Sequence, residues 1–351
     1  MGLFNDRTKN NKGQTQVPVW FMRQAGRYHS HYQNIKKNSD FMTMCKDPKL
    51  ATEITMGPID DFKFDAAILF SDLLFPLEQM GMGLSYESGP PTLAFQIATM
   101  ADIKKLKLQR PSKEFYSFQK TACAGIRERL PKEKTLLGFV GAPFTLYTYA
   151  VEGSHKGELT SSKKGFFDGR FTAFMEMLLP DLLAEMLVQA EGGADAVCLF
   201  DTAAGELMVS DYQEFVLPQI LKLTRDFKKH YPNKQIIYYS KLTHIEYLEA
   251  LSKMDETNSI DVLGVDWRMD LGAALLKLGH KYYIEGNIDP SYLHLPWNEL
   301  EKKLASFHAN LKNKNVPMNK WIFGLGHGVL QQTPEENVRK AVEYIHDQFT
   351  Y

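Results

Sequence analysis

The stretch Pro18-Val19-Trp20-Phe21-Met22-Arg23-Gln24-Ala25-Gly26-Arg27-Tyr28 begins as an apolar run and ends in two arginines around a glycine. The apolar part predicts a buried strand over Val17–Met22, followed by polar groups where the strand ends. A guanidinium group holds a carboxylate or a phosphate through two parallel hydrogen bonds. The stretch therefore predicts a site for an anionic ligand, with two solvated surface arginines as the simpler alternative.

Seven further apolar runs follow along the chain, each succeeded within a few residues by Gly, Asp, Ser or Asn. Their near-continuous apolarity is typical of strands that are buried on both faces of a parallel sheet. The runs are Ala66–Phe70, Leu136–Val140, Ala196–Phe200, Gln235–Tyr239, Asp261–Val265, Lys281–Ile284 and Lys320–Phe323.

Segments with helical spacing of apolar residues lie between these runs. They are Pro48–Phe62, Arg170–Glu191, Gln213–His230, Thr243–Lys253, Leu271–Leu278 and Pro334–Phe349. We expect Asp47 to cap the first of them and Pro180 to kink or split the second. Thr333, Pro334 and Glu336 predict a capping box at the start of the last.

Strands that alternate with helices predict an α/β fold, a single-domain (β/α)₈ TIM barrel, with a doubly wound open sheet as the alternative. Gly83–Ile97, with Gly89-Pro90-Pro91 in its middle, predicts a β-hairpin inserted after the second strand. Residues 1–16 are polar. We expect a flexible leader there and the barrel over residues 17–351.

The composition limits the class of protein. The chain has 351 residues, of which 44% are hydrophobic and 24% charged, and its formal net charge is −1. This balance predicts a globular protein without a global basic field for nucleic acid or an acidic membrane. The three cysteines, Cys45, Cys123 and Cys198, form no pair motif, and no apolar run approaches about 18 residues. We predict a cytoplasmic protein without disulfides, a membrane span or a metal on these cysteines.

Polar side chains follow the predicted strands at their carboxyl ends, where catalytic groups lie in barrels of this type. In chain order they include Arg23, Gln24, Arg27, Asp72, Tyr149, Thr202 and His327. Simpler alternatives are a helix cap for Asp72, a core tyrosine for Tyr149 and a turn residue for His327. Asp266 and Asp289 are interpreted as caps or turn residues.

Several segments resemble the uroporphyrinogen decarboxylase family, in register from about Val17 to about His346. These segments are Pro18–Tyr28, Phe70–Asp72, Gln79–Met82, Gly141–Gly153, Phe200–Gly205, Glu214–Pro218, Gly264–Trp267, Gly286–Pro290 and Gly326–Gly328. The first of them is highly specific to that family. The resemblance implies a (β/α)₈ barrel, which agrees with the count of predicted strands, and it suggests a homodimer.

The resemblance implies a lyase of haem and porphyrin biosynthesis that needs no cofactor or metal. Such an enzyme removes CO₂ from the four acetate side chains of uroporphyrinogen III and leaves the methyl groups of coproporphyrinogen III. Protonation of a pyrrole carbon creates a cation that takes up the electrons released with CO₂. A carboxylate near the pyrrole N–H groups favours this cation.

The resemblance also implies roles for the site residues. The implied substrate-binding residues are Arg23, Gln24, Ala25, Gly26, Arg27, Asp72, Tyr149, Thr202 and His327, and the implied catalytic residues are Asp72, Arg23 and Tyr149. Asp72 would hold the pyrrole N–H groups, and the arginines would bind substrate carboxylates. The proton would come from Arg23 or from a relayed water. The family usually has serine where this chain has Thr202, and the lysine-rich loop 154–164 lacks the family's glycine run.

Two other functions stay open. Related barrels include zinc-dependent corrinoid or thiol methyltransferases, which need a set of His and Cys ligands that this sequence lacks. A non-catalytic protein that binds a tetrapyrrole or another carboxylate is the second alternative. The presence of Arg23, Arg27 and Asp72 together argues against both.

Overall fold

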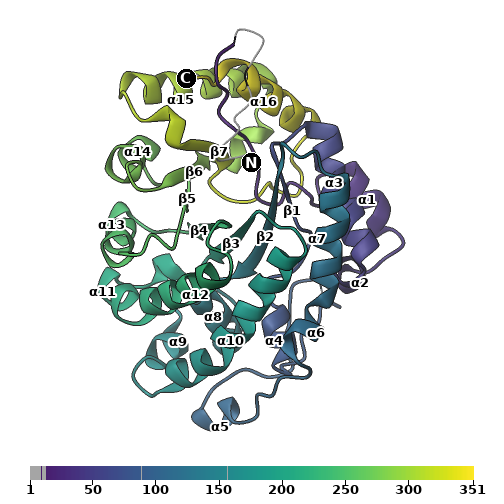
Figure 1. The fold of residues 1–351 in the computed structure, drawn as a ribbon, viewed down its shortest axis with the longest axis vertical. Helices are drawn as coiled ribbons and strands as arrows, with labels where there is room; N and C mark the ends of the chain where they lie inside the picture. Colours follow the sequence, from purple (N-terminus) through teal and green to yellow (C-terminus); the bar gives the residue numbers. More distant parts are fainter. Residues whose placement is uncertain (1–8, 10–12, 88, 156) are drawn as a thin grey trace.

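A computed structural model of the chain describes residues 9, 13–87, 89–155 and 157–351. Within these ranges the strands form one parallel sheet in the order β1-β2-β3-β4-β5-β6-β7, with helices around it (Figure 1). The strands are β1 (Ala66–Ile68), β2 (Thr135–Gly141), β3 (Ala196–Asp201), β4 (Gln235–Ser240), β5 (Val262–Val265), β6 (Tyr283–Ile288) and β7 (Trp321–Leu325). Every pair of neighbours is parallel, so all carboxyl ends lie on one edge.

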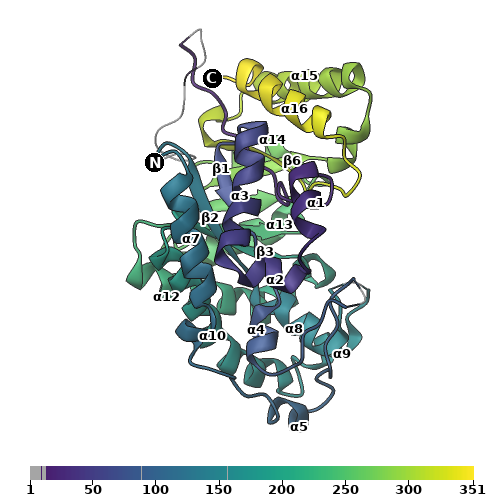
Figure 2. The same ribbon diagram turned by 90° about the vertical axis from the view of Figure 1, so that its right-hand side faces the viewer.

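The helices include those that the sequence predicts and several short ones. They are α1 (Ser30–Lys36), α2 (Phe41–Lys46), α3 (Pro48–Phe62), α4 (Phe75–Gln79), α5 (Met100–Ile103), α6 (Ser112–Phe115), α7 (Ser117–Arg129), α8 (Pro143–Glu152), α9 (Thr160–Lys164), α10 (Arg170–Glu191), α11 (Val209–Asp211), α12 (Leu217–His230), α13 (Ile245–Met254), α14 (Leu271–Leu278), α15 (Trp297–Asn313) and α16 (Glu335–Gln348). A π-helix over Tyr212–Val216 leads into α12. Helices α3 and α7 pack side by side on the face shown in Figure 2. In the described ranges, no helix combines the length and apolarity needed to cross a membrane.

The first predicted strand, Val17–Met22, is not a regular strand. It forms one parallel bridge, between Val19 and Phe323 of β7. Side chains, and not a neighbouring strand, accept hydrogen bonds from two of its backbone N–H groups: Asp65 Oδ2 accepts from Val19 N at 2.7 Å, and Gln24 Oε1 accepts from Phe21 N at 3.2 Å. Pro18 has no N–H to donate. The expectation of eight strands is therefore wrong by one within the described residues.

The segment nevertheless joins the two edges of the sheet. On one side Phe323 N donates to Pro18 O at 2.8 Å, and Trp20 N donates to Phe323 O at 3.2 Å. On the other side Asp65, directly before β1, donates from its backbone N–H to Val19 O at 2.9 Å. The result is a curled, all-parallel sheet like that of a TIM barrel.

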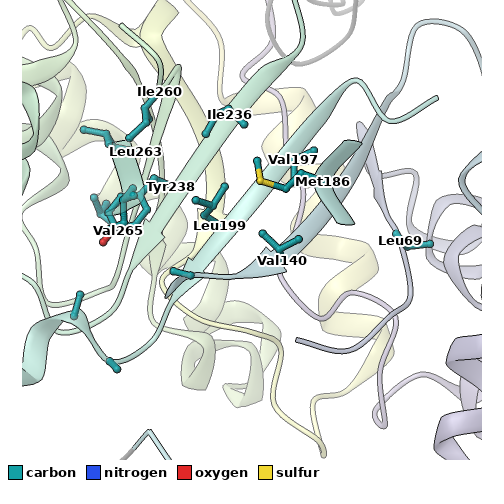
Figure 3. Packing of buried hydrophobic residues seen from close by; sticks show 14 of the residues in the cluster. Leu69, Val140, Met186, Val197, Leu199, Ile236, Tyr238, Ile260, Leu263 and Val265 are labelled. Carbon is teal, nitrogen blue, oxygen red and sulfur yellow. The ribbon is translucent and has the colours of Figure 1, made fainter. Parts of the chain in front are cut away.

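Alternate residues of the strands enter two different apolar clusters, as the period of a strand requires. On β3, Val197 and Leu199 lie in the large cluster under the helices, and Figure 3 shows part of it. The other face of the sheet carries a second cluster made of Trp20, Met22, Ala66, Ile68, Leu137, Ala196, Cys198, Phe200, Ile237, Tyr239, Val262 and Ile322. The prediction of strands buried on both faces is confirmed.

Two further local predictions concern helices α3 and α10. Asp47 caps α3, since its carboxylate accepts from Lys49 N at 2.8 Å. Helix α10 is not split at Pro180: it runs over Arg170–Glu191 with Pro180 exposed and with buried apolar side chains on both sides of it.

The predicted capping box at the last helix does not form. Helix α16 begins after Pro334 as its N-cap, without a side-chain cap bond. Thr333 Oγ1 instead pairs with His294 Nε2 at 3.2 Å, and Glu336 Oε2 accepts from Arg339 at 2.9 Å. Both capping groups are thus engaged elsewhere.

The predicted hairpin over Gly83–Ile97 is reduced to a single antiparallel bridge between Ser85 and Thr92, and α4 precedes it. The expected flexible leader, residues 1–16, falls mostly outside the described residues. Within them, Gln16 forms an antiparallel bridge with Thr350, so the two ends of the described chain lie side by side.

Candidate active site

The arginine-bearing loop after the first apolar run turns sharply at Arg23, whose φ is 61°. Its side chain lies against Gly328, because a Cβ at Gly328 would stand 2.7 Å from Arg23 Cγ. Arg23 has an exposed surface, yet desolvation by the surrounding protein lowers its pKa. The guanidinium is thus accessible to solvent and yet partly desolvated, and the region around it, with Gly328 beside it, is here called the recess.

The backbone between the two arginines is available to an anion. In the described part of the chain, the N–H groups of Ala25, Gly26 and Arg27 donate to no protein acceptor. Successive free N–H groups of this kind attract carboxylate or phosphate oxygens. With the Gln331 amide turned to satisfy its neighbours, Gln331 Oε1 accepts from Arg27 Nη2 at 3.0 Å.

The side chain of Gln24 has a structural role. It accepts from Phe21 N and donates from Nε2 to Ala66 O of β1 at 2.9 Å. The backbone carbonyl of Gln24 accepts from Tyr28 Oη at 2.8 Å. These bonds hold the arginine loop against β1. Gln24 thus fixes the loop whose backbone N–H groups, at Ala25 and Gly26, are available to an anion.

Asp72 lies just beyond β1 and is half-buried. Its Oδ1 accepts from Leu74 N at 2.7 Å, and its Oδ2 accepts from the Tyr86 hydroxyl. The helix cap of the simpler interpretation does not form, because the N-cap of α4 is Leu74 and it has no side-chain cap bond. Burial raises the pKa of Asp72, while the bonds from Tyr86 and Leu74 oppose that rise. The two bonds fix the orientation of the carboxylate.

Tyr149 of α8 faces both Asp72 and Arg23. Burial and then the Asp72 charge raise the pKa of Tyr149 to about 12, and Arg23 acts in the opposite direction. The hydroxyl is bonded to His155 Nδ1 at 2.6 Å. Tyr149 thus stays protonated at neutral pH, and these electrostatic contacts bring Arg23, Asp72 and Tyr149 to one recess.

His327 follows β7 at the same edge. Desolvation lowers its pKa to about 3, and the positive charges of Arg23 and Lys241, together with His155, add to the effect. The imidazole is therefore neutral at physiological pH. It can donate or accept one hydrogen bond, and it adds no charge to the arginine side of the recess.

Thr202 lies at the end of β3, and its backbone N–H donates to Thr145 Oγ1 at 2.9 Å. Its own hydroxyl oxygen is buried and has no partner among the described residues. Neighbouring Asp201 is structural, since it accepts from Thr145 Oγ1 and from Tyr238 Oη. Asp289 caps the turn after β6 by accepting from Ser291 N at 2.9 Å, as the sequence predicts.

The sequence did not point to Tyr86 or His155, which the structure adds to this edge of the sheet, and it gave Lys241 only as the end of a predicted strand. Tyr86 comes from the predicted hairpin and His155 from the loop after α8. The available signal was an aromatic residue inside a Gly-, Ser- and Pro-rich insertion. Among the described residues, no three His, Cys, Asp or Glu side chains cluster as a metal site.

Comparison with known proteins assigns these features to one family. The model of the family described as "Uroporphyrinogen decarboxylase (URO-D)" matches residues 7–348. A uroporphyrinogen decarboxylase from Roseiflexus sp. (strain RS-1) is 36% identical over 337 residues, which cover 94% of each chain. One from Geobacter sulfurreducens is 35% identical over 332 residues, again with 94% of each chain covered.

A solved structure supports the fold alone. A methyltransferase from Methanosarcina mazei superposes with a TM-score of 0.72 over 95% of this chain and 94% of its own, at 16% sequence identity. This similarity matches the curled parallel sheet and carries no information about the reaction.

Proposed function

The chain belongs to the uroporphyrinogen decarboxylase family, a family of carboxy-lyases, and we propose that the recess around Asp72 is where it decarboxylates uroporphyrinogen. The observation that carries this proposal is the convergence of Asp72, Tyr149 and Arg23. The charges of the Asp72 carboxylate and of the Arg23 guanidinium both act on the protonated phenol of Tyr149, which lies between them in effect.

Asp72 is suited to stabilise the cation on which the reaction depends. The four pyrrole N–H groups of the substrate converge on its centre, and an ionised carboxylate accepts from such donors. Protonation of a pyrrole carbon makes the N–H groups more acidic, so their bonds to Asp72 strengthen as the barrier is crossed. An interaction that strengthens in this way lowers the barrier rather than only improving binding.

The arginine loop is suited to the periphery of the substrate, which carries eight carboxylates. Arg23, Arg27 and the free N–H groups of Ala25 and Gly26 together offer two charged forks and a backbone anion site. His327 adds a neutral hydrogen-bonding group. In this proposal the Asp72 carboxylate stabilises the pyrrole cation, while the arginines hold the carboxylates of the substrate.

Each decarboxylation breaks a C–C bond, releases CO₂ and consumes one proton, which ends on the new methyl group. The proton that activates the pyrrole carbon is returned when the ring regains its aromatic form. Tyr149 keeps its proton at neutral pH and can therefore orient a substrate carboxylate without competing for positive charge. No cofactor is required in this scheme, because the protonated ring accepts the electrons.

We also propose that residues 17–22 take the place of the eighth strand of a (β/α)₈ barrel. The arginine loop then lies at the carboxyl edge of the sheet, where Asp72 also lies. The bonds of residues 17–22 to both Phe323 and Asp65 support this. The homodimer that the family resemblance suggests is likewise a proposal, for which sedimentation at several concentrations is the measurement.

The test is an anaerobic assay with uroporphyrinogen III after exhaustive chelation and dialysis, with products separated by their number of carboxylates. We expect seven-, six- and five-carboxylate intermediates and then coproporphyrinogen, at a rate that added zinc does not change. Absence of any product from folded protein would refute the proposal. Activity that only zinc restores would favour the methyltransferase alternative.

A further inference from the structure

Tyr86 contacts the carboxylate on which the proposed reaction depends, although it comes from the inserted segment and not from a strand end. Its hydroxyl donates to Asp72 Oδ2, while Leu74 N donates to Oδ1 at 2.7 Å. Each carboxylate oxygen therefore has one protein donor. These two bonds fix the plane of the group and leave further lone pairs for a ligand.

Two contacts, one at Tyr86 and one further along at Ile97, hold the inserted segment in place. The ring of Tyr86 packs on Phe41 of α2, with 4.7 Å between the ring centroids. Further along, Ile97 N donates to Ala150 O of α8 at 2.9 Å. Because Ala150 follows Tyr149, the segment is tied to the helix that carries the second phenol.

The phenol of Tyr86 is a permanent donor. Burial and then the charge of Asp72 raise the pKa of Tyr86, so the hydroxyl keeps its proton. In return, the bond from Tyr86 is the largest of the effects that lower the pKa of Asp72, against the larger effect of burial. Tyr86 thus favours the ionised form of a carboxylate whose ionisation burial disfavours.

We propose that Tyr86 is a positioning residue for the reaction: its hydroxyl keeps the Asp72 carboxylate ionised and aimed at the pyrrole N–H groups. The inference rests on the proposed function, because that function makes Asp72 the electrostatic stabiliser. Tyr86 acts through Asp72 and forms no bond to reacting atoms. The insertion is then a working part of the site.

The other groups that interact electrostatically with Asp72 do not stabilise its ionised form. They are Cys45 of α2, Glu78 of α4, Tyr149 of α8 and Glu185 of α10. None of these four is a cation, and burial raises the pKa of both Cys45 and Glu185. The hydroxyl of Tyr86 is therefore the side-chain contact that offsets the burial of Asp72.

The variant Tyr86→Phe keeps the ring on Phe41 and removes only the hydroxyl. We expect kcat for the first decarboxylation to fall by about 10- to 100-fold, the range for a lost hydrogen bond to a charged group, with a small change in KM. The acid limb of kcat/KM should move to higher pH, because the ionised form of Asp72 has lost its donor. An unmoved acid limb would overturn the proposal.

A double-mutant cycle separates action through Asp72 from an independent effect. In the Asp72→Asn background, Tyr86→Phe should cost no further rate, so that the coupling equals the whole effect of the single substitution. Losses that multiply across the two substitutions would contradict the proposal.

Tyr116→Phe is the matched control. Tyr116 Oη donates to Asp181 Oδ2 at 2.5 Å, a tyrosine–aspartate pair outside the site. We expect this variant to lower Tm and leave the acid limb in place; an equal shift would reduce Tyr86 to a structural residue. An inactive wild type would refute the proposed function, whereas an active wild type with an unaltered Tyr86→Phe profile would refute this inference alone.

Discussion

At the scale of single residues, the hydroxyl of Thr202 stands out because it lies beside the candidate site. Its oxygen is buried and unbonded in the described part of the chain, while its backbone N–H is bonded to Thr145. A buried hydroxyl without a partner costs stability, because water has been removed and nothing replaces it. A bound substrate would supply that partner.

This situation separates a structural effect from a functional one. Thr202→Val removes the unpaired hydroxyl at similar volume, so we expect Tm to stay or rise. If a substrate group bonds the hydroxyl, KM should rise by about 5- to 10-fold, the value of one neutral hydrogen bond. Thr202→Ser is the control and should keep wild-type kinetics. A Thr202→Val enzyme with an unchanged KM would remove Thr202 from the substrate contacts.

At the scale of elements, the sequence predicted the site to the extent that strand ends define it. Arg23, Asp72 and Tyr149 could be grouped because parallel strands share one carboxyl edge. Tyr86 could not be found in the same way, because an insertion has no periodicity that fixes where its side chains point. The irregularity of Val17–Met22 was also hidden, since it depends on side chains, Asp65 and Gln24, that compete for backbone donors.

The contact between the arginine loop and the segment after β7 gives a prediction of its own. Gly328 follows β7, and a Cβ there would stand 2.7 Å from Arg23 Cγ and 3.1 Å from Arg23 Cβ. Gly328→Ala must therefore shift the Arg23 side chain from its Cβ outward, and the guanidinium with it. We expect kcat/KM to fall at least about 10-fold with a small change in Tm, because displacement of about 1 Å matters in catalysis. Wild-type kinetics in this variant would show that the position of Arg23 is not critical.

At the scale of the whole molecule, the face of the sheet turned away from the helices contains a buried acid. Glu285 of β6 lies between two glycines on the neighbouring strands, and a Cβ at Gly264 would stand 2.9 Å from its Oε2. A side chain at Gly324 would collide with its other oxygen. Burial raises the pKa of Glu285 to about 8, so the fold holds a neutral acid at its centre.

The acid makes the stability of the fold depend on pH. The pKa of Glu285 is 4.5 in the unfolded chain and about 8 in the fold. The stability that the neutral acid contributes is therefore fully present below pH 4.5 and is lost as pH rises through about 8. Glu285→Gln cannot ionise. Its free energy of unfolding, relative to wild type, should therefore increase between pH 5 and pH 8.5 by an amount on the order of a few kcal/mol. Urea titrations at the two pH values measure this; a difference that does not depend on pH would show that Glu285 is not neutral in the fold.

The central claim is that the molecule catalyses decarboxylation through one carboxylate, Asp72, at the mouth of the curled sheet. The most direct test compares the rate of the first decarboxylation of uroporphyrinogen III in wild type and in Asp72→Asn, with a melting curve for each. Asp289→Asn is the matched control, because Asp289 also follows a strand and accepts a turn-capping bond, from Ser291 N at 2.9 Å. We expect Asp72→Asn to lose about 10²- to 10³-fold in kcat with a nearly unchanged Tm, as for removal of one electrostatic stabiliser, and Asp289→Asn to keep its rate. A folded Asp72→Asn enzyme with a near-normal rate would contradict the account.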